Sequence, residues 1–283
     1  MRVHAIETGT VRIKSKQVEA KRPGPLGVVD IFTDPEWAGW VPTYAWAIEH
    51  EEGVIVVDSG QAAYLIEASA HSWHPFLRRN AAFRIEPEQE VGPQLKALGI
   101  GARDVKKVVL THLHVDHDAG IAHFPESEIL VAPGEAAKAR GIVGQLRGYL
   151  PQRWPTWFNP AALVLDDGAY GPFAASKRLT RDGSVVAVAT PGHTPDHVSV
   201  IVEDGDVALF LAGDTSYDEA RMLAGKVDGV SPNAAVTAGT LAAIRQFASE
   251  RPTVYLPAHD PMSGTRLAKR QVVPAGVAMK GAA

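Results

Sequence analysis

Four potential metal ligands, His112, His114, Asp116 and His117, occur within a stretch of six residues. They follow the apolar run Val105–Leu110, which predicts a short buried strand. A strand holds the start of such a segment rigid, and an irregular turn can then aim the two pairs of side chains at neighbouring positions. A solvated polar loop is the ordinary alternative, but three of the chain's 11 histidines fall here. We therefore interpret the segment as a metal-binding loop.

An apolar run that ends in a potential ligand recurs three times, in Val185–Ala189 before His193, Val207–Leu211 before Asp214, and Val254–Leu256 before His259. Each case alone has an ordinary explanation, because an aspartate after a strand commonly forms a turn. Together they add three nitrogen or oxygen ligands. The chain has no cysteine, which excludes disulfides, thiolate nucleophiles and thiolate ligands.

Five histidines and two aspartates can hold two divalent metal ions, and Asp214 is the best candidate for a carboxylate that bridges them. Imidazole and carboxylate groups suit Zn first, with Fe, Mn, Co or Ni as alternatives. Two cations about 3.5–4 Å apart can lower the pKa of a shared water and so supply hydroxide near neutral pH. The pattern predicts a metal-dependent hydrolase. The competing class is a non-catalytic metal-binding or interaction module, in which some of these ligands would be expected to be missing.

The composition is that of an ordinary globular protein. The 283 residues are 46% hydrophobic and 21% charged, which is compatible with a single domain over residues 1–283. The net charge of -4 weighs against a nucleic-acid partner. The N-terminus has no apolar segment of signal-peptide length, and no stretch approaches the roughly 18 apolar residues of a membrane span. We expect a cytoplasmic protein with no membrane partner.

The pattern along the chain alternates clusters of strands with helices. Strands are expected at 44–49, 54–57, 105–110, 129–132, 163–165, 185–189, 198–202, 207–211 and 254–256, and helices at 86–98, 238–249 and within 134–160. A polar turn between the first two strands, and Asp204-Gly205 later, predict hairpins and hence antiparallel or mixed pairing. Residues 61–90 have no clean period and are expected to form helix fragments and an irregular loop. These features favour two sheets with helices outside.

The HxHxDH segment, the sequence TPGHT at residues 190–194, the strand-end aspartate and the late strand-end histidine together resemble the metallo-β-lactamase fold superfamily over residues 40–262. The resemblance implies an α+β protein, an αββα sandwich of two mixed β-sheets flanked by helices, with metals at one edge of the sheets. By motif position, His112, His114 and His193 would bind the first metal, Asp116, His117 and His259 the second, and Asp214 would bridge them.

Tyr217, three residues after Asp214, resembles a feature of the N-acyl homoserine lactone lactonases, the quorum-quenching branch. The resemblance implies that a metal-bridging hydroxide attacks the ring carbonyl of a lactone, that Tyr217 helps to stabilise the oxyanion, and that Asp116 carries a proton to the leaving group. A small-molecule lactone or ester is then the substrate, and a homodimer is an option because dimers are common in that branch. The ordinary alternative for Tyr217 is a core residue. The alternative activity is hydrolysis of another ester or a phosphoester on the same fold.

Several nearby side chains have less specific interpretations. His123 is expected to be a packed or surface histidine, and His197 a residue that hydrogen-bonds beside the site without binding metal. The resembling family usually has a small residue where this chain has Asp118. Its carboxylate either hydrogen-bonds next to the metal ligands or is solvated, and we expect it to be solvated. The aromatic residues of loop 146–158 either line an acyl pocket or pack in the ordinary way; they are Trp154, Trp157 and Phe158.

Overall fold

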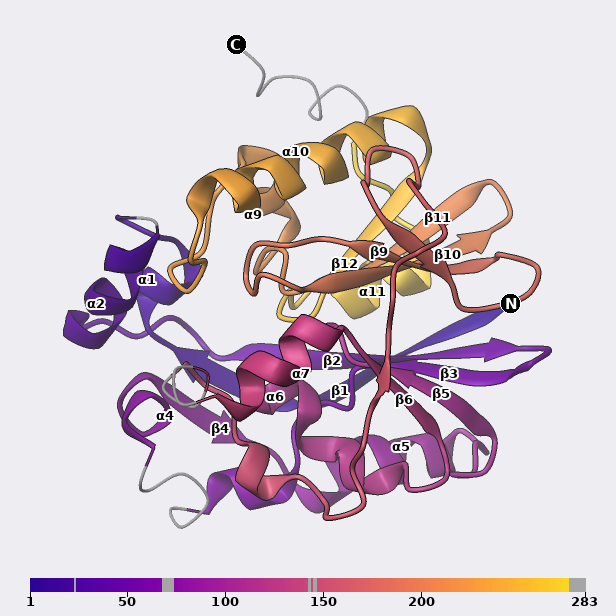
Figure 1. The fold of residues 1–283 in the computed structure, drawn as a ribbon, viewed down its shortest axis with the longest axis horizontal. Helices are drawn as coiled ribbons and strands as arrows, with labels where there is room; N and C mark the ends of the chain where they lie inside the picture. The colour runs from indigo at the N-terminus through magenta and orange to yellow at the C-terminus, as the bar shows by residue number, and fades with distance from the viewer. Residues whose placement is uncertain (23, 68–73, 142–143, 145–146, 275–283) are drawn as a thin grey trace. The chain divides into compact units, whose positions relative to one another are not determined.

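The computed structural model describes residues 1–22, 24–67, 74–141, 144 and 147–274 (Figure 1). The chain divides into two compact units, and each has its own β-sheet. The first unit consists of Met1–Lys14 and Pro35–Leu163, and the second of Ser15–Asp34 and Val164–Ala283. The single domain expected over residues 1–283 stays a prediction.

The first unit contains a seven-stranded sheet in the order β4-β1-β2-β3-β5-β6-β7. Its strands are β1 (Arg2–Ile13), β2 (Val41–His50), β3 (Gly53–Val57), β4 (Ala81–Arg84), β5 (Val105–Val109), β6 (Glu128–Val131) and β7 (Ala161–Ala162). The pairs from β4 to β3 are antiparallel and those from β3 to β7 are parallel. The helices are α4 (Pro75–Asn80), α5 (Val91–Ala97), α6 (Val115–Asp118) and α7 (Pro133–Arg140), with short 3-10 turns η1 (Ala63–Ile66), η2 (Pro87–Gln89), η3 (Ala119–His123) and η4 (Pro151–Arg153).

Strand β5 is the base of the metal-binding segment, and the core of the first unit holds it in place. Val108 and Leu110 are fully buried and belong to one apolar cluster with Val91 and Leu95 of α5. The backbone N–H of Leu110 donates to Leu130 O at 3.0 Å, which extends the pairing with β6 past the end of β5. The residues that follow therefore leave a rigid edge rather than a mobile loop.

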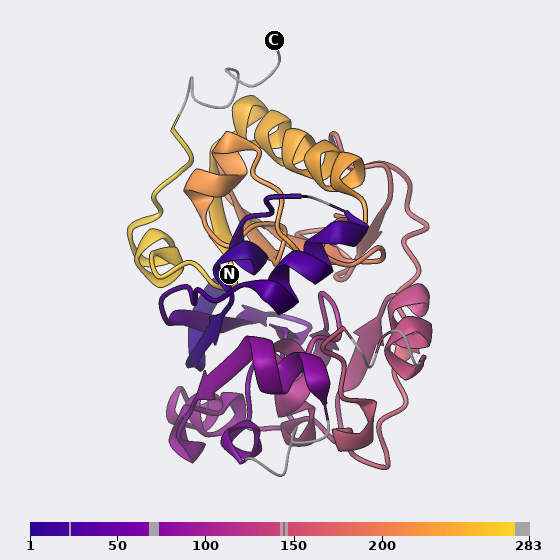
Figure 2. The same ribbon diagram turned by 90° about the vertical axis from the view of Figure 1, so that its left-hand side faces the viewer.

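The second unit contains a five-stranded sheet in the order β12-β11-β10-β9-β8. Its strands are β8 (Ser176–Arg178), β9 (Val185–Ala189), β10 (Val198–Asp204), β11 (Val207–Gly213) and β12 (Thr253–Pro257). All pairs are antiparallel except β11 with β12, which is parallel. The helices are α1 (Ser15–Val18), α2 (Pro25–Thr33), α9 (Glu219–Ala224), α10 (Ala234–Glu250) and α11 (Ser263–Lys269). Figure 2 turns α1 and α2 toward the viewer.

Helix α10 packs its apolar stripe on the second sheet (Figure 1). The side-chain carbonyl of Asn233 caps its first turn by accepting from the N–H groups of Ala235 and Val236. Leu241, Ile244 and Phe247 recur at helical spacing and join the buried cluster of the sheet. The parallel pairing of β11 with β12 places the ends of these two strands at the same edge, where both are followed by polar residues.

The expected architecture of two mixed sheets flanked by helices is confirmed. The hairpin formed by β2 and β3 and the hairpin formed by β10 and β11 are both antiparallel, as predicted. The strand expected at 163–165 is wrong, because β6 pairs instead with Ala161–Ala162. The helix expected at 86–98 is split, since Glu86 and Gln89 form a reciprocal capping box that closes a separate turn before α5.

Strand β1 was not among the expected elements, and neither was β4, which falls in the segment without a clean period. The two strands pair with each other at one end of the first sheet, where Val11 lies opposite Phe83. Long-range pairing of this kind leaves no local periodic signal when neither strand alternates cleanly. In the described part of the chain, no helix is long and apolar enough to cross a membrane.

Candidate metal centre

The first ligand group consists of His112, His114, Asp116 and His117. His112 and His114 lie between the end of β5 and the short helix α6, and Asp116 and His117 lie within α6. His112 and His117 are fully buried, and His114 and Asp116 are half-buried. The chain turns sharply here because the N–H groups of His117 and Asp118 both donate to His114 O, at 2.9 and 3.2 Å. The turn brings the rings of His112 and His117 to a centroid separation of 4.2 Å. Residues spaced along the sequence thus converge in space.

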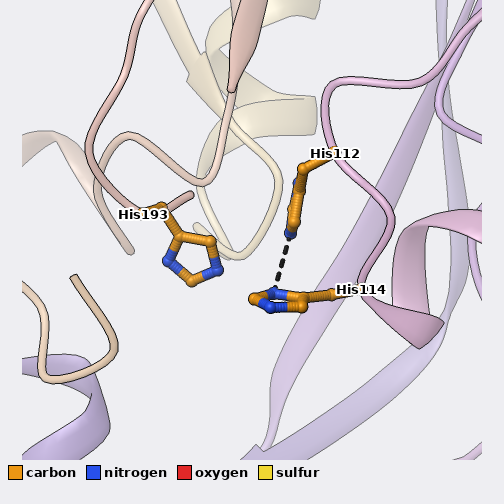
Figure 3. A group of neighbouring side chains, drawn as sticks. All are labelled: His112, His114 and His193. Atoms are coloured by element: carbon orange, nitrogen blue, oxygen red, sulfur yellow. Dashed lines mark hydrogen bonds between the residues drawn. The ribbon is translucent and has the colours of Figure 1, made fainter. Parts of the chain in front are cut away.

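His112 and His114 point ring nitrogens at each other. The Nε2 atom of His112 lies 3.0 Å from the Nδ1 atom of His114 (Figure 3). The other ring nitrogen of His112, Nδ1, lies 3.0 Å from Thr111 Oγ1, which fixes the ring plane. Two imidazole nitrogens this close to each other, with the His112 ring held by Thr111 through its other nitrogen, match the way histidines bind one metal ion.

His117 is held by Asp58, which directly follows β3 and was not among the expected site residues. The Nδ1 atom of His117 lies 2.9 Å from Asp58 Oδ2, and both side chains are buried. Asp58 also accepts from the backbone N–H of Thr111 at 2.7 Å and from its hydroxyl at 3.0 Å. A carboxylate behind a histidine orients the ring, makes Nε2 the ligand atom and raises its basicity. Asp58 therefore connects the end of β3 to the metal-binding segment.

The second ligand group consists of His193, Asp214 and His259, which follow β9, β11 and β12. The two carboxylate oxygens of Asp214 face different histidines, with Oδ2 at 3.3 Å from His193 Nε2 and Oδ1 at 3.4 Å from His259 Nε2. All three side chains are buried. A carboxylate that presents one oxygen to each of two imidazoles has the geometry expected of a ligand shared between two ions.

Asp228 supports His193 in the same way that Asp58 supports His117. Its Oδ2 atom lies 3.1 Å from His193 Nδ1. Its Oδ1 atom accepts from the N–H groups of Val230 and Ser231 and from the Ser231 hydroxyl, at 2.8–3.0 Å. The carboxylate is thus fixed by its own loop, and it assigns Nε2 of His193 as the ligand atom. The sequence patterns gave no signal for Asp228.

His197 supports the backbone of the bridging residue. Its Nε2 atom accepts a hydrogen bond from Asp214 N at 3.1 Å, so its Nδ1–H donates to Thr190 Oγ1 at 2.9 Å. His197 therefore hydrogen-bonds beside the site, as expected.

Tyr217 stacks on the ring of His259, with a centroid distance of 5.5 Å and an interplanar angle of 22°. Its side chain is 5% exposed, and its hydroxyl accepts from Gln17 Nε2 at 3.4 Å. Tyr217 thus lies beside a metal-ligand candidate rather than in the apolar cluster of the second unit. Gln17 is a neighbour that the sequence patterns did not indicate.

Asp118 was expected to be solvated, and that expectation is wrong. The residue is 2% exposed, and the indole N–H of Trp154 donates to its Oδ2 atom at 2.6 Å. Burial raises the pKa of Asp118 well above its ordinary value, and the hydrogen bond from Trp154 opposes that shift. Asp118 is the last residue of α6, and Trp154 supplies its carboxyl with the hydrogen-bond donor that water would otherwise provide.

Among the aromatic residues named in loop 146–158, Trp154 and Phe158 pack in the ordinary way and Trp157 does not. Phe158 belongs to the apolar cluster of the first unit, and Trp154 packs against it at a ring distance of 5.0 Å. Trp157 is 43% exposed. His123 is half-buried and lies 2.5 Å from a Glu90 carboxylate oxygen, in line with the packed or surface position expected.

The donor chemistry of the two ligand groups fits divalent metal ions. Each group offers imidazole nitrogens and carboxylate oxygens, and no thiolate exists in the chain. Three of the histidines carry a hydrogen-bond partner on Nδ1, supplied by Thr111, Asp58 and Asp228. Such partners leave the opposite nitrogen to act as ligand, which is the usual arrangement around bound zinc and similar ions.

Comparison with known proteins identifies the family. Residues 38–259 match the sequence model of the metallo-beta-lactamase superfamily, and the chain belongs to that superfamily. A probable metallo-hydrolase of Mycobacterium bovis is 33% identical over 183 residues, which cover 60% of this chain and 55% of the relative. The chain thus matches about half the length of that relative.

Two similar proteins are named as lactone hydrolases. The N-acyl homoserine lactonase AttM of Rhizobium radiobacter is 24% identical over 271 residues, which cover 92% of this chain and 94% of the relative. A solved structure of an N-acyl homoserine lactone hydrolase, with the product N-hexanoyl-L-homoserine at its catalytic metal centre, has a TM-score of 0.73 and 19% identity. It covers 93% of this chain and 94% of the other. At that identity the structural similarity establishes the shared fold.

Proposed function

We propose that this protein is a dinuclear metal-dependent hydrolase that opens the ring of N-acyl homoserine lactones. The observation that carries the proposal is the Asp214 carboxylate, whose two oxygens face the Nε2 atoms of His193 and His259 at 3.3 and 3.4 Å. The named activity of the AttM relative, which aligns over 92% of this chain, supports the lactone as substrate.

The proposed ligand sets combine residues of both groups, with Asp214 shared. The first ion is assigned to His112, His114 and His193, and the second to Asp116, His117 and His259. Zinc is the first choice of metal, because imidazole and carboxylate ligands without thiolates suit it well, and Fe, Mn, Co or Ni remain alternatives. When bound, two such ions supply Lewis acidity, which lowers the pKa of water and polarises a carbonyl.

The chain's own residues account for the remaining chemistry. The Tyr217 hydroxyl would donate a hydrogen bond to the ring carbonyl oxygen as negative charge develops on it. Asp116 would accept a proton from the attacking water and deliver it to the alkoxide oxygen when the ring C–O bond breaks. Asp58 and Asp228 keep the imidazoles of His117 and His193 in one tautomer and orientation throughout.

The decisive experiment measures ring opening by pH-stat with N-hexanoyl and N-dodecanoyl homoserine lactones. Metal-loaded and chelator-treated protein are compared, and metal content is determined in parallel. We expect rapid turnover that chelation abolishes and about two ions per chain. Fully metallated protein that leaves both lactones intact would overturn the lactonase proposal and direct attention to other esters and phosphoesters.

Two substitutions test the assigned roles. Tyr217→Phe should lower kcat by about 10- to 1000-fold with little change in metal content, because one oxyanion donor is removed. Asp116→Asn should lower kcat further, since both a proton carrier and a ligand are changed. Tyr170→Phe is the matched control, because Tyr170 is a half-buried tyrosine that hydrogen-bonds Glu203 away from the ligand residues. Retention of full activity by both Tyr217→Phe and Asp116→Asn would contradict the assignment.

The remaining features of the proposal come from the sequence and from the resemblance to the lactonases. They are a cytoplasmic location, a homodimer as the assembly to test, and a small molecule rather than nucleic acid or membrane as the partner. Size-exclusion chromatography with light scattering decides the assembly.

A further inference from the structure

The segment that carries Gln17 is fixed to the loop that carries Asp228. The backbone N–H of Gly229 donates to Gln17 O at 2.9 Å, and the N–H of Ala20 donates to Val227 O at 2.9 Å. The two backbones approach so closely that a Cβ on Gly229 would lie 2.1 Å from Lys16 O. Since Asp228 in turn holds His193, the position of Gln17 is tied to that of a proposed metal ligand.

The side chain of Gln17 reaches the hydroxyl of Tyr217. Its Nε2 atom donates to Tyr217 Oη at 3.4 Å. A phenol oxygen that accepts this N–H must direct its own hydrogen elsewhere. The Tyr217 ring is buried and stacks on His259, which limits the positions that its hydroxyl can take. Gln17 thus favours the state in which Tyr217 acts as a donor, which the proposed reaction requires.

The other polar atom of the Gln17 side chain is a buried acceptor. Its Oε1 atom has no hydrogen-bond donor within the described ranges of the chain. A buried acceptor left without a donor is destabilising, so a ligand that supplies the donor gains affinity by removing that penalty. The neighbouring nitrogen of the same amide is already used on Tyr217, which places the acceptor close to the hydroxyl that would meet the substrate carbonyl.

An N-acyl homoserine lactone carries the donor that this arrangement lacks. The lactone ring has only acceptors, but the carbon next to the ring carbonyl bears an amide N–H. We propose that Gln17 is a specificity-determining residue whose Oε1 atom accepts this amide N–H while its Nε2 atom orients Tyr217. The inference rests on the proposed lactonase activity. The inference adds a substrate preference: the enzyme should favour lactones that carry an amide N–H beside the ring carbonyl over simple alkyl lactones.

The test compares N-hexanoyl-L-homoserine lactone with γ-decalactone, which has no amide. Gln17→Met keeps the length of the side chain but removes both hydrogen-bonding atoms. We expect the ratio of kcat/KM for the amide substrate to that for γ-decalactone to fall about five- to tenfold, the effect of one lost hydrogen bond. Gln246→Met is the matched control, because Gln246 is exposed on α10 and bonds Glu250; its ratio should stay at the wild-type value.

Gln17→Glu tests the link to Tyr217 separately. A carboxylate cannot donate to the phenol oxygen and instead accepts its O–H, so kcat should fall for both lactones toward the level of Tyr217→Phe. Adding Gln17→Glu to Tyr217→Phe should then cost little more, because both changes remove the same donor. An unchanged substrate ratio in Gln17→Met, or fully additive losses in the double variant, would overturn the inference. Wild-type turnover of the two lactones reports on the lactonase activity itself, so the two failures are distinguishable.

Discussion

The Nδ1 atom of His117 lies 2.9 Å from the Oδ2 atom of Asp58, although the two residues are 59 positions apart in the chain. Both side chains are buried, and Asp58 adopts a left-handed backbone conformation with φ of 60°. Aspartate and asparagine tolerate that conformation better than most residues. The backbone of Asp58 therefore turns the chain after β3, and its carboxylate orients a proposed metal ligand.

Asp58→Asn should weaken metal binding without unfolding the protein. Asparagine keeps the left-handed turn and an acceptor for Thr111, but it removes the negative charge behind His117. Loss of such a partner commonly reduces metal affinity 10- to 100-fold. Competition with a coloured zinc chelator measures this directly. Glu49→Gln is the control, since Glu49 pairs with His4 at 2.6 Å on an exposed part of the first sheet and should leave metal affinity unchanged.

Gly120→Ala should disturb the metal-binding segment through backbone contact. A Cβ at this position would lie 2.2 Å from Ser59 O, and Ser59 itself donates to His117 O at 2.8 Å. The clash must move backbone, so we expect a loss of about 1–3 kcal/mol in the free energy of unfolding and weaker metal binding. Gly239→Ala in the middle of α10 has open space around it and should gain about 0.5–1 kcal/mol. Urea denaturation of both variants checks the opposite signs, and a stable Gly120→Ala protein would refute the close approach.

Arg266→Leu should destabilise the protein strongly. Arg266 is buried and donates to Asp260 Oδ2 at 2.6 Å, and that carboxylate also accepts from Glu219 N at 3.0 Å. Removing the cation leaves a charged carboxylate buried, which typically costs about 3–5 kcal/mol. Arg103→Leu, which breaks an exposed pair with Glu126, should cost less than about 1 kcal/mol. Chemical denaturation measures the free energy of unfolding of both variants. Equal losses would contradict the prediction that the buried ion pair contributes more than the exposed one.

Tyr170→Phe should lower the free energy of unfolding near neutral pH, and this loss should become smaller at alkaline pH. Burial, reinforced by the hydrogen bond to Glu203, raises the pKa of Tyr170 from 10.0 to about 12. Because the folded pKa is the higher one, its contribution is fully present below pH 10 and is lost as pH rises toward 12. The variant should therefore be less stable than wild type by about 1 kcal/mol near neutral pH. That difference should shrink between pH 10 and pH 12 in guanidinium titrations; a constant difference would exclude the raised pKa.

Local sequence patterns were sufficient to predict the ligand types and the strands that carry them. His112, His193 and Asp214 each follow an apolar run that is a strand in the structure, because burial of a short run and the residue at its end are local properties. The absence of cysteine likewise restricted the ligands to nitrogen and oxygen before any fold was known. These patterns are what indicated the metallo-beta-lactamase superfamily, which the comparisons establish.

The residues that support those ligands could be found only from the folded structure. Asp58, Asp228 and Gln17 carry no local signal, since an aspartate after a strand or in a loop has the same pattern whether or not a histidine faces it. Asp118 was expected in solvent and is buried, because Trp154, 36 positions away, covers and hydrogen-bonds it. Hydrogen bonds between distant residues depend on how the sheets pair and how the loops pack. Local periodicity reports burial and secondary structure, and it contains no information about which distant partner a buried polar group will meet.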